Sequence, residues 1–542
     1  MERPGPLDLP VSRLSIDPAA APTVSTSHRH GLSLPHWTRT PWAYRLCEGI
    51  TAGLIYAMVV FSPWAFGTTQ EWSIWVMNFA GFALGILLLT KWIIRWRTGY
   101  QPSRWGAPSM EDDDDEKRKR QRWSKGITVT LAVLTILVLL YCLVSAVNAR
   151  AVFHWDTLGF EYHDHYIAWL PHSYDSSSTW FVFWEYLGLA LTFWATRDWL
   201  LGKTRKERQK ERIESEGEPN LVLPRHSNKS WQIPGRLEVL LWILCLNAAL
   251  LGLEGILQRL DGSGKLLWMV RPRINQEAAG QFGPYAYRGN AAQYYNLVWP
   301  ICLGFWWTLR QKARRAWTKG VRVGSGPQML LLPCVVITAA CPIISTSRGG
   351  AIVAAGGLVS TTVLLLLADR RGHWLARLGI FLLFLVTLGM STFLGWDQLE
   401  DRLKHVFNDD WSGRVQIYEN ARQMARDFPV LGSGPGTFAP LYQLYRKVGQ
   451  EWMAQVHDDW LETRITFGWL GFSLVLWLLV TVLLHWRVGT GIESSWVFLC
   501  MLWIAVGGCL VHAKYDFPFQ IHSVLALFLM HCSLLSCLAR KA

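Results

Sequence analysis

Long apolar blocks constrain this chain more than any other feature. They recur along most of its 542 residues, of which 51% are hydrophobic. Each block is about 18–22 residues long, the length that a helix needs to cross a hydrocarbon core of about 30 Å. We therefore predict an all-α polytopic membrane protein with about twelve transmembrane helices. The predicted spans are residues 45–63, 73–94, 126–147, 179–200, 237–257, 291–309, 328–345, 350–368, 378–395, 466–485, 496–512 and 520–538.

The placement of tryptophan supports a membrane protein. The chain has 32 tryptophans, and several stand at the edges of the apolar blocks. An amphipathic indole ring favours the headgroup level of a bilayer, which accounts for these positions. A soluble enzyme is excluded by the same pattern. The edge residues include Trp72, Trp75, Trp180, Trp184, Trp477 and Trp486.

The basic residues indicate an orientation rather than a nucleic-acid partner. The formal net charge is +13, but Lys and Arg gather in the connections between apolar blocks, and mostly in alternate ones. Because such residues are enriched in cytoplasmic loops, the more basic side should be cytoplasmic. An even number of spans then places both termini in the cytoplasm. The basic connections include residues 117–120, 203–212, 310–322 and 370–371.

The ten cysteines argue against a disulfide-stabilised secreted domain. All of them fall in or beside apolar segments, and no C-x-x-C pair is present. We therefore expect cysteines that pack between helices. They are Cys47, Cys142, Cys245, Cys302, Cys334, Cys341, Cys500, Cys509, Cys532 and Cys537.

Four regions are predicted along the chain. Residues 1–42 form a disordered cytoplasmic tail, because they are rich in Pro, Ser, Thr and His and lack the apolar core of a signal peptide. Residues 43–395 contain the N-terminal transmembrane helices with charged cytoplasmic loops. A large periplasmic loop follows at 396–465, and residues 466–542 contain the C-terminal transmembrane helices.

Two charged runs in the predicted inner loops indicate solvated segments. Residues 111–122 are a block of acids followed by a block of bases, and residues 203–218 are similarly charged. Such runs are usually solvated. A divalent-cation site in the acidic run is disfavoured, because oxygen ligands must be spaced along a turning loop.

The large outer loop contains an amphipathic segment. Ile417, Ala421, Met424 and Phe428 recur at helical spacing before Pro429 ends the run. This pattern predicts a short helix that lies on the outer membrane surface.

Four polar elements stand out on the outer side, where polar groups beside lipid are costly to keep without a use. Two of them flank predicted spans, one opens the amphipathic helix and one forms an outer hairpin. They are residues 282–290, 345–350, 412–418 and 456–462.

These elements contribute Arg288, Arg348, Arg414 and His457. Guanidinium groups bind phosphate oxygens bidentately, and a neutral imidazole accepts a proton near neutral pH. Together the four side chains suit a pyrophosphate leaving group and an alcohol acceptor. None is specific alone, since a lone interfacial arginine is commonly a snorkelling anchor and a lone loop histidine is commonly structural.

Three further features have weaker interpretations. The glycine-rich residues 432–436 lack the Gly-Lys-Ser/Thr ending of a nucleotide loop, so we predict a turn. Glu185 and Glu254 lie within predicted spans, where an acid is a functional hypothesis by default, although both could also cap helix contacts. Zinc is not expected at four histidines of the first outer loop, because their spacing matches no familiar ligand pair. These are His154, His163, His165 and His172.

Several of these elements resemble the O-antigen ligase and polymerase family of bacterial envelope enzymes. Residues 412–418 and 427–438 are similar to the family's Gly-Arg and Pro-x-x-Gly-x-Gly-x-Gly-x-Phe pattern. His457 opens a segment that resembles the family's His-Asn-x-x-Leu motif, and residues 282–290 resemble its Phe-Gly-x-x-x-Asn-Arg-Asn element. Residues 347–349 and 512–518 also match family positions, so the resemblance extends over about 280–520.

The chain departs from the family pattern at three positions. Asp458 replaces the asparagine after the histidine, Tyr287 replaces the asparagine before the arginine, and Gly289 is inserted before Asn290. An additional acid beside His457 either raises its basicity or changes a loop hydrogen bond. These departures bear on the acceptor more than on the reaction class.

The resemblance implies an inverting, metal-independent glycosyl transfer without a cofactor. A glycan would pass from an undecaprenyl-diphosphate donor to a lipid-borne or glycan hydroxyl, at the periplasmic face of a bacterial inner membrane, in lipopolysaccharide or polysaccharide biosynthesis. His457 would be the general base, and Arg288, Arg414 and Arg348 would bind the donor diphosphate. The supporting residues would be Asn290, Asp458, Lys514 and Asp516.

Alternatives remain open from the sequence. A ligase and a repeat-unit polymerase share donor and residues, and the acceptor could also be a protein hydroxyl. A secondary transporter would fit twelve spans with both ends inside, but transporters commonly carry paired halves and broken helices at the midplane. A structural scaffold would leave the arginine and histidine positions freely mutable.

Overall fold

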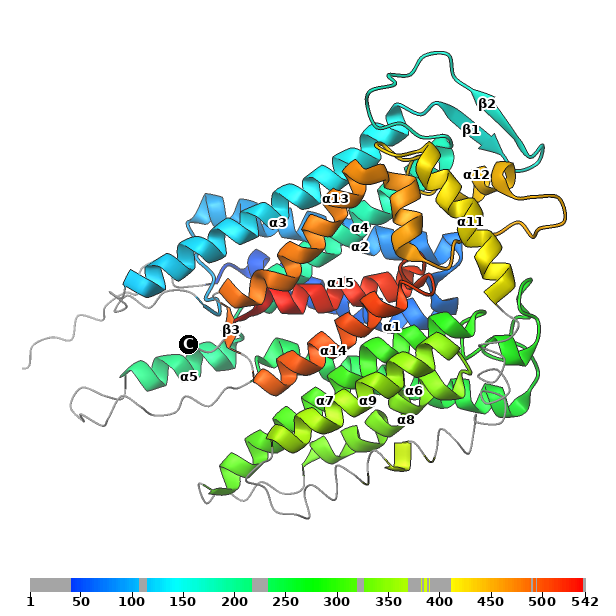
Figure 1. Cartoon of the computed structure of the whole chain (residues 1–542). Helices are drawn as coiled ribbons and strands as arrows, with labels where there is room; N and C mark the ends of the chain where they lie inside the picture. The colour runs from blue at the N-terminus through cyan, green and yellow to red at the C-terminus, as the bar shows by residue number, and fades with distance from the viewer. Residues whose placement is uncertain are drawn as a thin grey trace, which may run out of the picture.

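The computed structural model describes residues 40–106, 115–216, 233–318, 326–368, 411–488, 491–493 and 495–539, with short pieces between 382 and 389. The chain is predominantly helical, as predicted (Figure 1). The helices are α1 Trp42–Trp64, α2 Glu71–Thr98, α3 Asp115–Val147, α4 Ser176–Leu200, α5 Arg205–Glu216, α6 Gly235–Asp261, α7 Arg288–Thr318, α8 Leu331–Ile344, α9 Arg348–Ala368, α11 Trp411–Asp427, α12 Phe438–Tyr445, α13 Asp459–Val488, α14 Trp496–His512 and α15 His522–Cys537.

Seven helical segments of the described residues are long and apolar enough to cross a membrane. Every predicted span except 378–395 coincides with a helix, and that span lies largely outside the described residues. The helices α14 and α15 are apolar but shorter. The chain is thus an all-α membrane protein, while the number twelve stays a prediction. The seven segments are Trp42–Trp64, Glu71–Thr98, Lys119–Val147, Gly235–Asp261, Pro327–Ile344, Arg348–Ala368 and Asp459–Val488.

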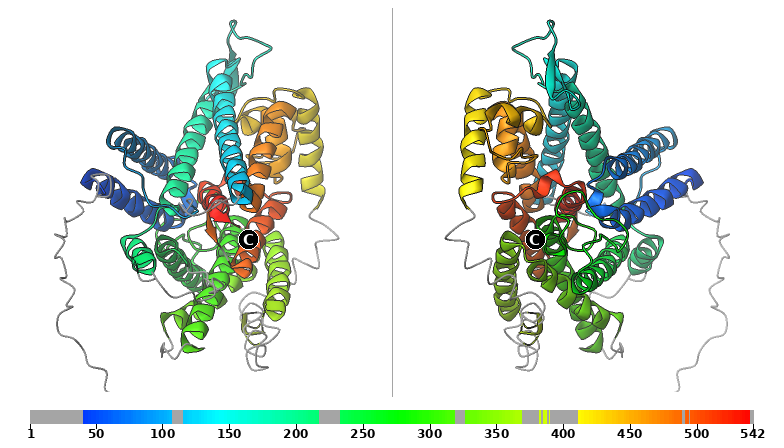
Figure 2. Two further views of the ribbon diagram at one scale, coloured as in Figure 1. Left: turned by 90° about the vertical axis from the view of Figure 1, so that its left-hand side faces the viewer. Right: turned by 90° about the vertical axis from the view of Figure 1, so that its right-hand side faces the viewer.

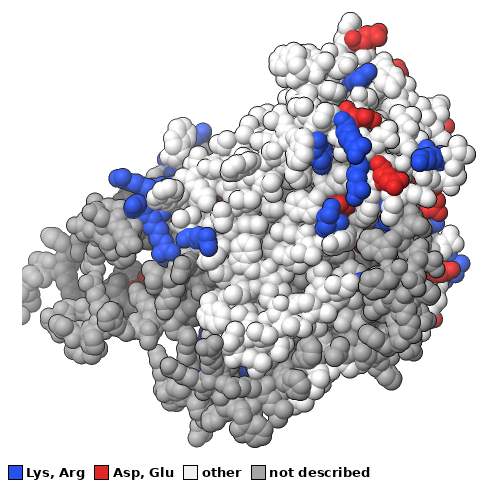
Figure 3. Space-filling view, in the orientation of Figure 1, with Lys and Arg blue, Asp and Glu red and all other residues white. Residues whose placement is uncertain are grey.

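The surface charge agrees with a membrane-spanning chain. In Figure 3, lysine and arginine gather at one end of the molecule, while acidic and basic residues mix at the other. The broad described surface between these ends is almost free of charge. Because an uncharged belt is what hydrocarbon requires, the bundle axis runs between the two charged ends.

The helix α7 forms the centre of the bundle. It packs against α8, α9 and α14, and its Tyr294, Tyr295 and Trp299 are almost completely buried. Its polar residue Asn296 is also buried and donates a hydrogen bond of 3.0 Å to the Gly350 carbonyl at the start of α9. Neighbouring helices therefore surround α7 on most sides. The start of α7, at Arg288, lies close to the start of α9.

A second group of helices packs beside this centre. The helices α3 and α4 pack on each other, α13 packs on α3, and α2 packs on α4. Figure 2 shows α1 and α2 side by side at the flank of the bundle. The helix α15 contacts both α4 and α13, and also α7 and α14, so it joins the two groups.

The loop between α3 and α4 contains strands, which the prediction of a purely helical fold did not include. The strands β1 Ala151–His154 and β2 Gly159–Tyr162 pair antiparallel, with Ala151 opposite Tyr162. Two further two-residue strands, Ile492–Glu493 and Leu538–Ala539, pair in parallel near the opposite end. Both pairs are small additions to the helical bundle.

The amphipathic helix forms as predicted, and its apolar face packs on protein. In α11, Ile417, Ala421 and Met424 are buried. They belong to one apolar cluster with residues of α12 and the start of α13, including Leu441 and Ile465. The apolar face of α11 is therefore covered by protein rather than by lipid, because α12 and the residues after it fold back over it.

The helix α13 begins earlier than the span predicted at 466–485. It starts at Asp459 and breaks at Gly468, whose φ of 61° and ψ of −172° are not helical. The glycine-rich turn predicted at 432–436 packs into this break, and the Ser433 N–H donates to the Ile465 carbonyl at 2.9 Å. The segment 459–467 is thus a separate first part of the helix that leads away from His457.

Candidate functional site

His457 lies in the loop directly before α13, in a backbone conformation that non-glycine residues rarely adopt. Its φ is 59°, in the left-handed region. The Tyr418 hydroxyl of α11 donates a hydrogen bond of 3.1 Å to the His457 carbonyl. Next to it, the Val456 N–H donates to Glu462 Oε2 at 3.0 Å. Strained residues of this kind persist where surrounding contacts fix them, and they cluster at functional sites.

The imidazole of His457 pairs with a buried carboxylate. Its Nδ1 lies 3.1 Å from Asp516 Oδ1, and Asp516 is 5% exposed. The Tyr287 hydroxyl donates to the other oxygen, Asp516 Oδ2, at 3.2 Å. The Phe517 ring packs edge-on against the imidazole, with ring centroids 4.8 Å apart. Two aromatic residues and one carboxylate therefore fix the orientation of His457.

Asp516 stays ionised in this environment. Burial alone would raise its pKa, but the hydrogen bond from His457 and the charges of His512, His457 and Arg414 together lower the pKa below the ordinary value. A carboxylate with a lowered pKa contributes stability that is present above the pKa of the unfolded chain, about 3.9, and is lost as pH falls through the lowered value. Burial and the nearby Asp516 charge raise the pKa of Tyr287, which therefore remains a donor.

Two chain segments far apart in sequence are joined at this point. Asp458 forms an ion pair with Lys514, and the Asp458 carboxylate also accepts the Leu461 N–H at 3.1 Å, which caps α13. The Asp459 N–H donates to the Ala513 carbonyl at 2.8 Å. These contacts hold the loop before α13 against the loop after α14, and so hold His457 beside Asp516.

The helices α7 and α9 both begin at the same place. A Cβ added at Gly289, the second residue of α7, would lie 2.5 Å from Asp516 Oδ2. A Cβ added at Gly349, the second residue of α9, would lie 2.8 Å from His512 Nε2. Because the first N–H groups of a helix lack intrahelical partners and carry partial positive charge, helix starts beside the His457–Asp516 pair favour an anion there.

The three predicted arginines approach this region from different elements. Arg414 of α11 donates to the Tyr515 carbonyl at 3.1 Å, and its charge acts on Asp516 and Tyr287. Arg288 and Arg348 are the first residues of α7 and α9. The Arg288 guanidinium donates to the Ala279 carbonyl at 2.9 Å, which directs it along the preceding loop.

The remaining predicted residues also lie here. Asn290, two residues into α7, is buried, and Lys514 is paired with Asp458 as described. The structure thus brings His457, Asp458, Lys514 and Asp516 into direct contact, and it brings the backbone of the arginines to the same end of the bundle.

Sequence reasoning missed two polar residues of this end, Gln293 and Arg259, and it noted His512 only as part of the family match at 512–518. The His512 Nδ1 lies 2.7 Å from the Gln293 side-chain oxygen, and His512 Nε2 lies 3.7 Å from Asp516 Oδ2. Arg259 of α6 donates to the Thr346 hydroxyl at 2.8 Å and to the Ala278 carbonyl at 2.8 Å. Gln293 falls within the predicted span 291–309, and that intramembrane position is the signal that could have found it. Arg259 lies just after the predicted span 237–257 among other polar residues and gives no such signal.

Other features that the sequence singled out lie apart from this pair. Glu185 accepts from His522 Nδ1 at 2.9 Å, whereas neither carboxylate oxygen of buried Glu254 has a hydrogen-bond partner among the described residues. In the first outer loop, His154 pairs with Glu161 at 2.9 Å. No group of three or more potential metal ligands occurs in the described part of the chain.

Comparison with protein families gives one match. Residues 333–476 match the family model described as O-antigen ligase. This segment is similar to the O-antigen ligase family. The resemblance drawn from the motifs is therefore confirmed. No curated protein matches the chain significantly.

The O-antigen ligase match covers α8, α9, α11, α12 and the first part of α13. It includes Arg348, Arg414 and His457, while Arg288 and Asp516 lie on either side of it. Members of this family are membrane glycosyltransferases, which act on lipid-linked glycans and glycan acceptors. The chain is accordingly a membrane protein of which residues 333–476 are similar to this family.

Proposed function

We propose that this protein transfers a glycan from an undecaprenyl-diphosphate donor to a hydroxyl acceptor, with inversion at the anomeric carbon. The reaction takes place at the end of the bundle where α7, α9 and α13 begin, which we assign to the periplasmic side of the bacterial inner membrane. The proposal rests above all on one observation: Asp516 holds the Nδ1 side of His457 and leaves the other nitrogen open.

The pairing determines which nitrogen can act as a base. A hydrogen bond from Nδ1 to a carboxylate places the proton of the neutral imidazole on Nδ1. His457 Nε2 then carries the lone pair, and it has no hydrogen-bond partner among the described residues. The carboxylate also stabilises the imidazolium that forms when Nε2 takes a proton, as an aspartate does in hydrolases that use a histidine base.

The donor diphosphate is assigned to the positive groups around this pair. Arg414, together with Arg288 and Arg348, supplies guanidinium groups that match phosphate oxygens. The starts of α7 and α9 lie beside the same region and add the partial positive charge of helix N-termini. These groups stabilise the charge that grows on the diphosphate as its bond to the sugar breaks.

The acceptor hydroxyl loses its proton to His457 Nε2, and its oxygen forms a bond to the anomeric carbon. The bond between that carbon and the diphosphate oxygen breaks, and the electron pair leaves with undecaprenyl diphosphate. Asn290, Asp458 and Lys514 support the fold of the site. No step uses a metal ion or a cofactor.

The acceptor distinguishes a ligase from a polymerase. We favour ligation onto a lipid-borne acceptor, while repeat-unit polymerisation uses the same donor and the same residues. In a strain that lacks this protein, loss of glycan attachment identifies a ligase and loss of chain length identifies a polymerase.

Purified protein in detergent, supplied with a lipid-diphosphate glycan and an acceptor, tests the proposal. His457→Ala should lower the turnover rate by about 10²–10⁴-fold, the usual contribution of a general base. His163→Ala is the matched control, because His163 is an exposed outer-loop histidine without a side-chain contact among the described residues.

The same assay includes EDTA. Transfer should continue unchanged, and loss of product with EDTA would overturn the metal-free mechanism. Full transfer by His457→Ala would remove the base assignment, and full transfer after reversal of charge at Arg414 would remove the diphosphate assignment.

A further inference from the structure

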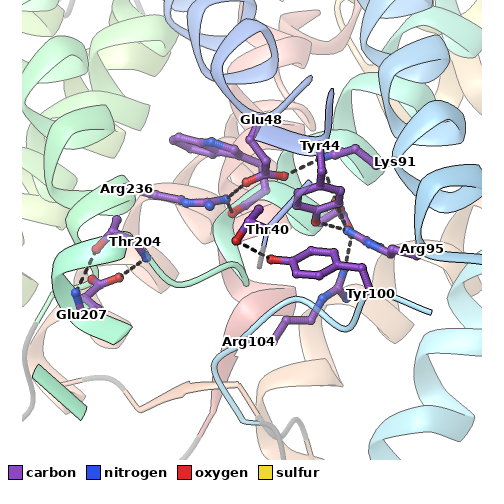
Figure 4. Close-up of polar contacts among 12 residues, drawn as sticks. Thr40, Tyr44, Glu48, Lys91, Arg95, Tyr100, Arg104, Thr204, Glu207 and Arg236 are labelled. Atoms are coloured by element: carbon purple, nitrogen blue, oxygen red, sulfur yellow. Dashed lines mark hydrogen bonds and ion pairs between the residues drawn. The ribbon is translucent and has the colours of Figure 1, made fainter. Parts of the chain in front are cut away.

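A cluster of ion pairs lies at the end of the bundle opposite the O-antigen ligase site (Figure 4). The helix α6 links the two ends: it begins at Gly235 beside the cluster and reaches Arg259, which contacts Thr346, near the site. With 27 residues, α6 spans about 40 Å. The cluster is therefore remote from the glycan-transfer reaction and has no part in it.

The centre of the cluster is a lysine without any solvent exposure. Lys91 of α2 lies 3.0 Å from Glu48 Oε1 of α1 and 2.8 Å from Asp198 Oδ2 of α4. Three guanidinium groups share the same two carboxylates. Arg236 pairs with Glu48, while Arg95 and Arg104 both pair with Asp198.

These contacts leave an excess of positive charge. Four cations face two carboxylates, and no third carboxylate of the described residues forms an ion pair with any of the four. Uncompensated charge in a poorly solvated place is costly, so a negative group from outside the chain would be stabilised here.

Two of the four cations, Arg95 and Arg104, are partly exposed at the surface. Arg95 and Arg104 each reach Asp198 through Nη2, and the buried Nε of Arg95 has no hydrogen-bond partner among the described residues. Both arginines line an open pocket of about 480 Å³. Its other lining residues are Trp92, Trp96, Gly99, Tyr100, Gln101 and Pro102.

The walls of the pocket indicate where its ligand comes from. Trp92 and Trp96 belong to the last turns of the apolar helix α2 and are 50% and 83% exposed. Trp42, at the start of the neighbouring α1, is 72% exposed. Exposed tryptophans at the ends of membrane helices lie at the headgroup level, where phosphate groups of lipids are abundant and acyl chains are adjacent.

We propose that Arg95 and Arg104 bind the headgroup phosphate of an anionic phospholipid, with Trp92 and Trp96 against its glycerol and upper acyl chains. The phosphate supplies the negative charge that the ion-pair cluster lacks. Basic pockets at the ends of membrane helices are a recognised form of headgroup site. By the basic-loop asymmetry, this end of the protein faces the cytoplasmic leaflet.

Native mass spectrometry of the full chain in detergent tests the site. The probes are phosphatidylglycerol and phosphatidylcholine, which differ in net charge. The wild type should retain phosphatidylglycerol in preference, and Arg104→Gln should weaken this retention about fivefold, the effect of one basic residue at a membrane surface. Arg104 is the best position to change, because its side chain is 31% exposed and forms an ion pair only with Asp198 among the described residues.

Arg97→Gln is the matched control. Arg97 lies on the last turn of α2, as Arg95 does, carries the same charge as Arg104 and is exposed, but it does not line the pocket. It should retain phosphatidylglycerol as the wild type does. Equal retention by Arg104→Gln and the wild type, or equal loss in both variants, would overturn the proposal.

A competition with inorganic phosphate separates the two sources of the anion. A lipid site should keep its phosphatidylglycerol, because tryptophan contacts hold the acyl chains. Displacement of the lipid by phosphate alone would overturn the lipid assignment. Thermal unfolding of each variant with and without phosphatidylglycerol supplies the second measurement, since a bound lipid should raise the midpoint of the wild type and of Arg97→Gln only.

Discussion

His457 is the residue on which the candidate chemistry depends, and its surroundings differ from those of an ordinary loop histidine. Its left-handed backbone is held by a hydrogen bond from Tyr418 and by the ion pair with Asp516. The sequence identified His457 and Asp516 separately through family motifs. Their pairing could not be predicted, because 59 residues separate them and only the packing of α13 against the loop after α14 brings them together.

Replacing Asp516 with asparagine should show whether Asp516 positions the His457 imidazole or binds the donor. The amide side chain would keep the size of the carboxylate but remove the charge that holds the proton on His457 Nδ1, so Nε2 would be a poorer base. We expect kcat to fall by about 10²–10⁴-fold with little change in KM for the donor. Steady-state kinetics of the purified variant measure both values.

The control for this change is Asp164→Asn, an exposed aspartate of the first outer loop without a contact among the described residues. It should keep both constants. A rise in KM at unchanged kcat for Asp516→Asn would instead assign Asp516 to donor binding.

At the scale of elements, the break in α13 sets the direction of residues 459–467, which directly follow the loop that contains His457. Gly432 and Gly468 both have positive φ and approach each other closely, so that a Cβ added at Gly468 would collide with the Val430 carbonyl oxygen. Sequence analysis predicted the turn at 432–436 from its glycines. It missed the break, because a single glycine within an apolar run is common in membrane helices and gives no distinct signal.

Gly468→Ala should therefore destabilise the protein by more than strain alone. The φ of 61° and ψ of −172° lie in a region that is essentially restricted to glycine and costs about 1–3 kcal/mol for a residue with a Cβ, and the contact with Val430 adds to it. We expect a lower midpoint of thermal unfolding in detergent, together with lower transfer activity, since the first part of α13 would shift.

Two glycines provide the comparison. A Cβ at Gly449 would meet open space at a φ of +86°, so Gly449→Ala measures the strain without the contact. Gly507 lies within α14 and also faces open space without a positive φ, so Gly507→Ala should leave the midpoint unchanged or raise it. If Gly468→Ala were no worse than Gly449→Ala, close packing of the break would not matter.

At the scale of the molecule, two polar ends are separated by a described surface almost free of charge on the face drawn in Figure 3. The sequence predicted this division from the lengths of its apolar blocks, and most predicted spans coincide with helices. It could not predict which faces of those helices meet, because all-round apolar helices carry little directional signal. The burial of α7 was for this reason not foreseen. The apolar face of α11 was predicted, but the pattern of one helix does not show whether protein or lipid covers that face.

The predicted orientation can be measured with single cysteines. Tyr515 is 52% exposed beside the candidate site, and Lys312 lies in the last part of α7 at the opposite end with a side chain 54% exposed. In intact spheroplasts, a membrane-impermeant maleimide should label Tyr515→Cys and should label Lys312→Cys only after permeabilisation. The native cysteines, which are buried apart from the partly buried Cys500, give the background in the unchanged protein. The reverse pattern would place the site in the cytoplasm.

The burial of Lys91 has a consequence for biogenesis. Glu48 is synthesised 43 residues before Lys91, whereas Asp198 emerges only with α4. An α1–α2 hairpin thus leaves the translocon with its buried ammonium group already neutralised. The guanidinium groups of Arg95 and Arg104 receive their carboxylate only when α4 is inserted. The chain therefore encodes an order of assembly in which the hairpin is completed first and α4 later fixes it to the bundle.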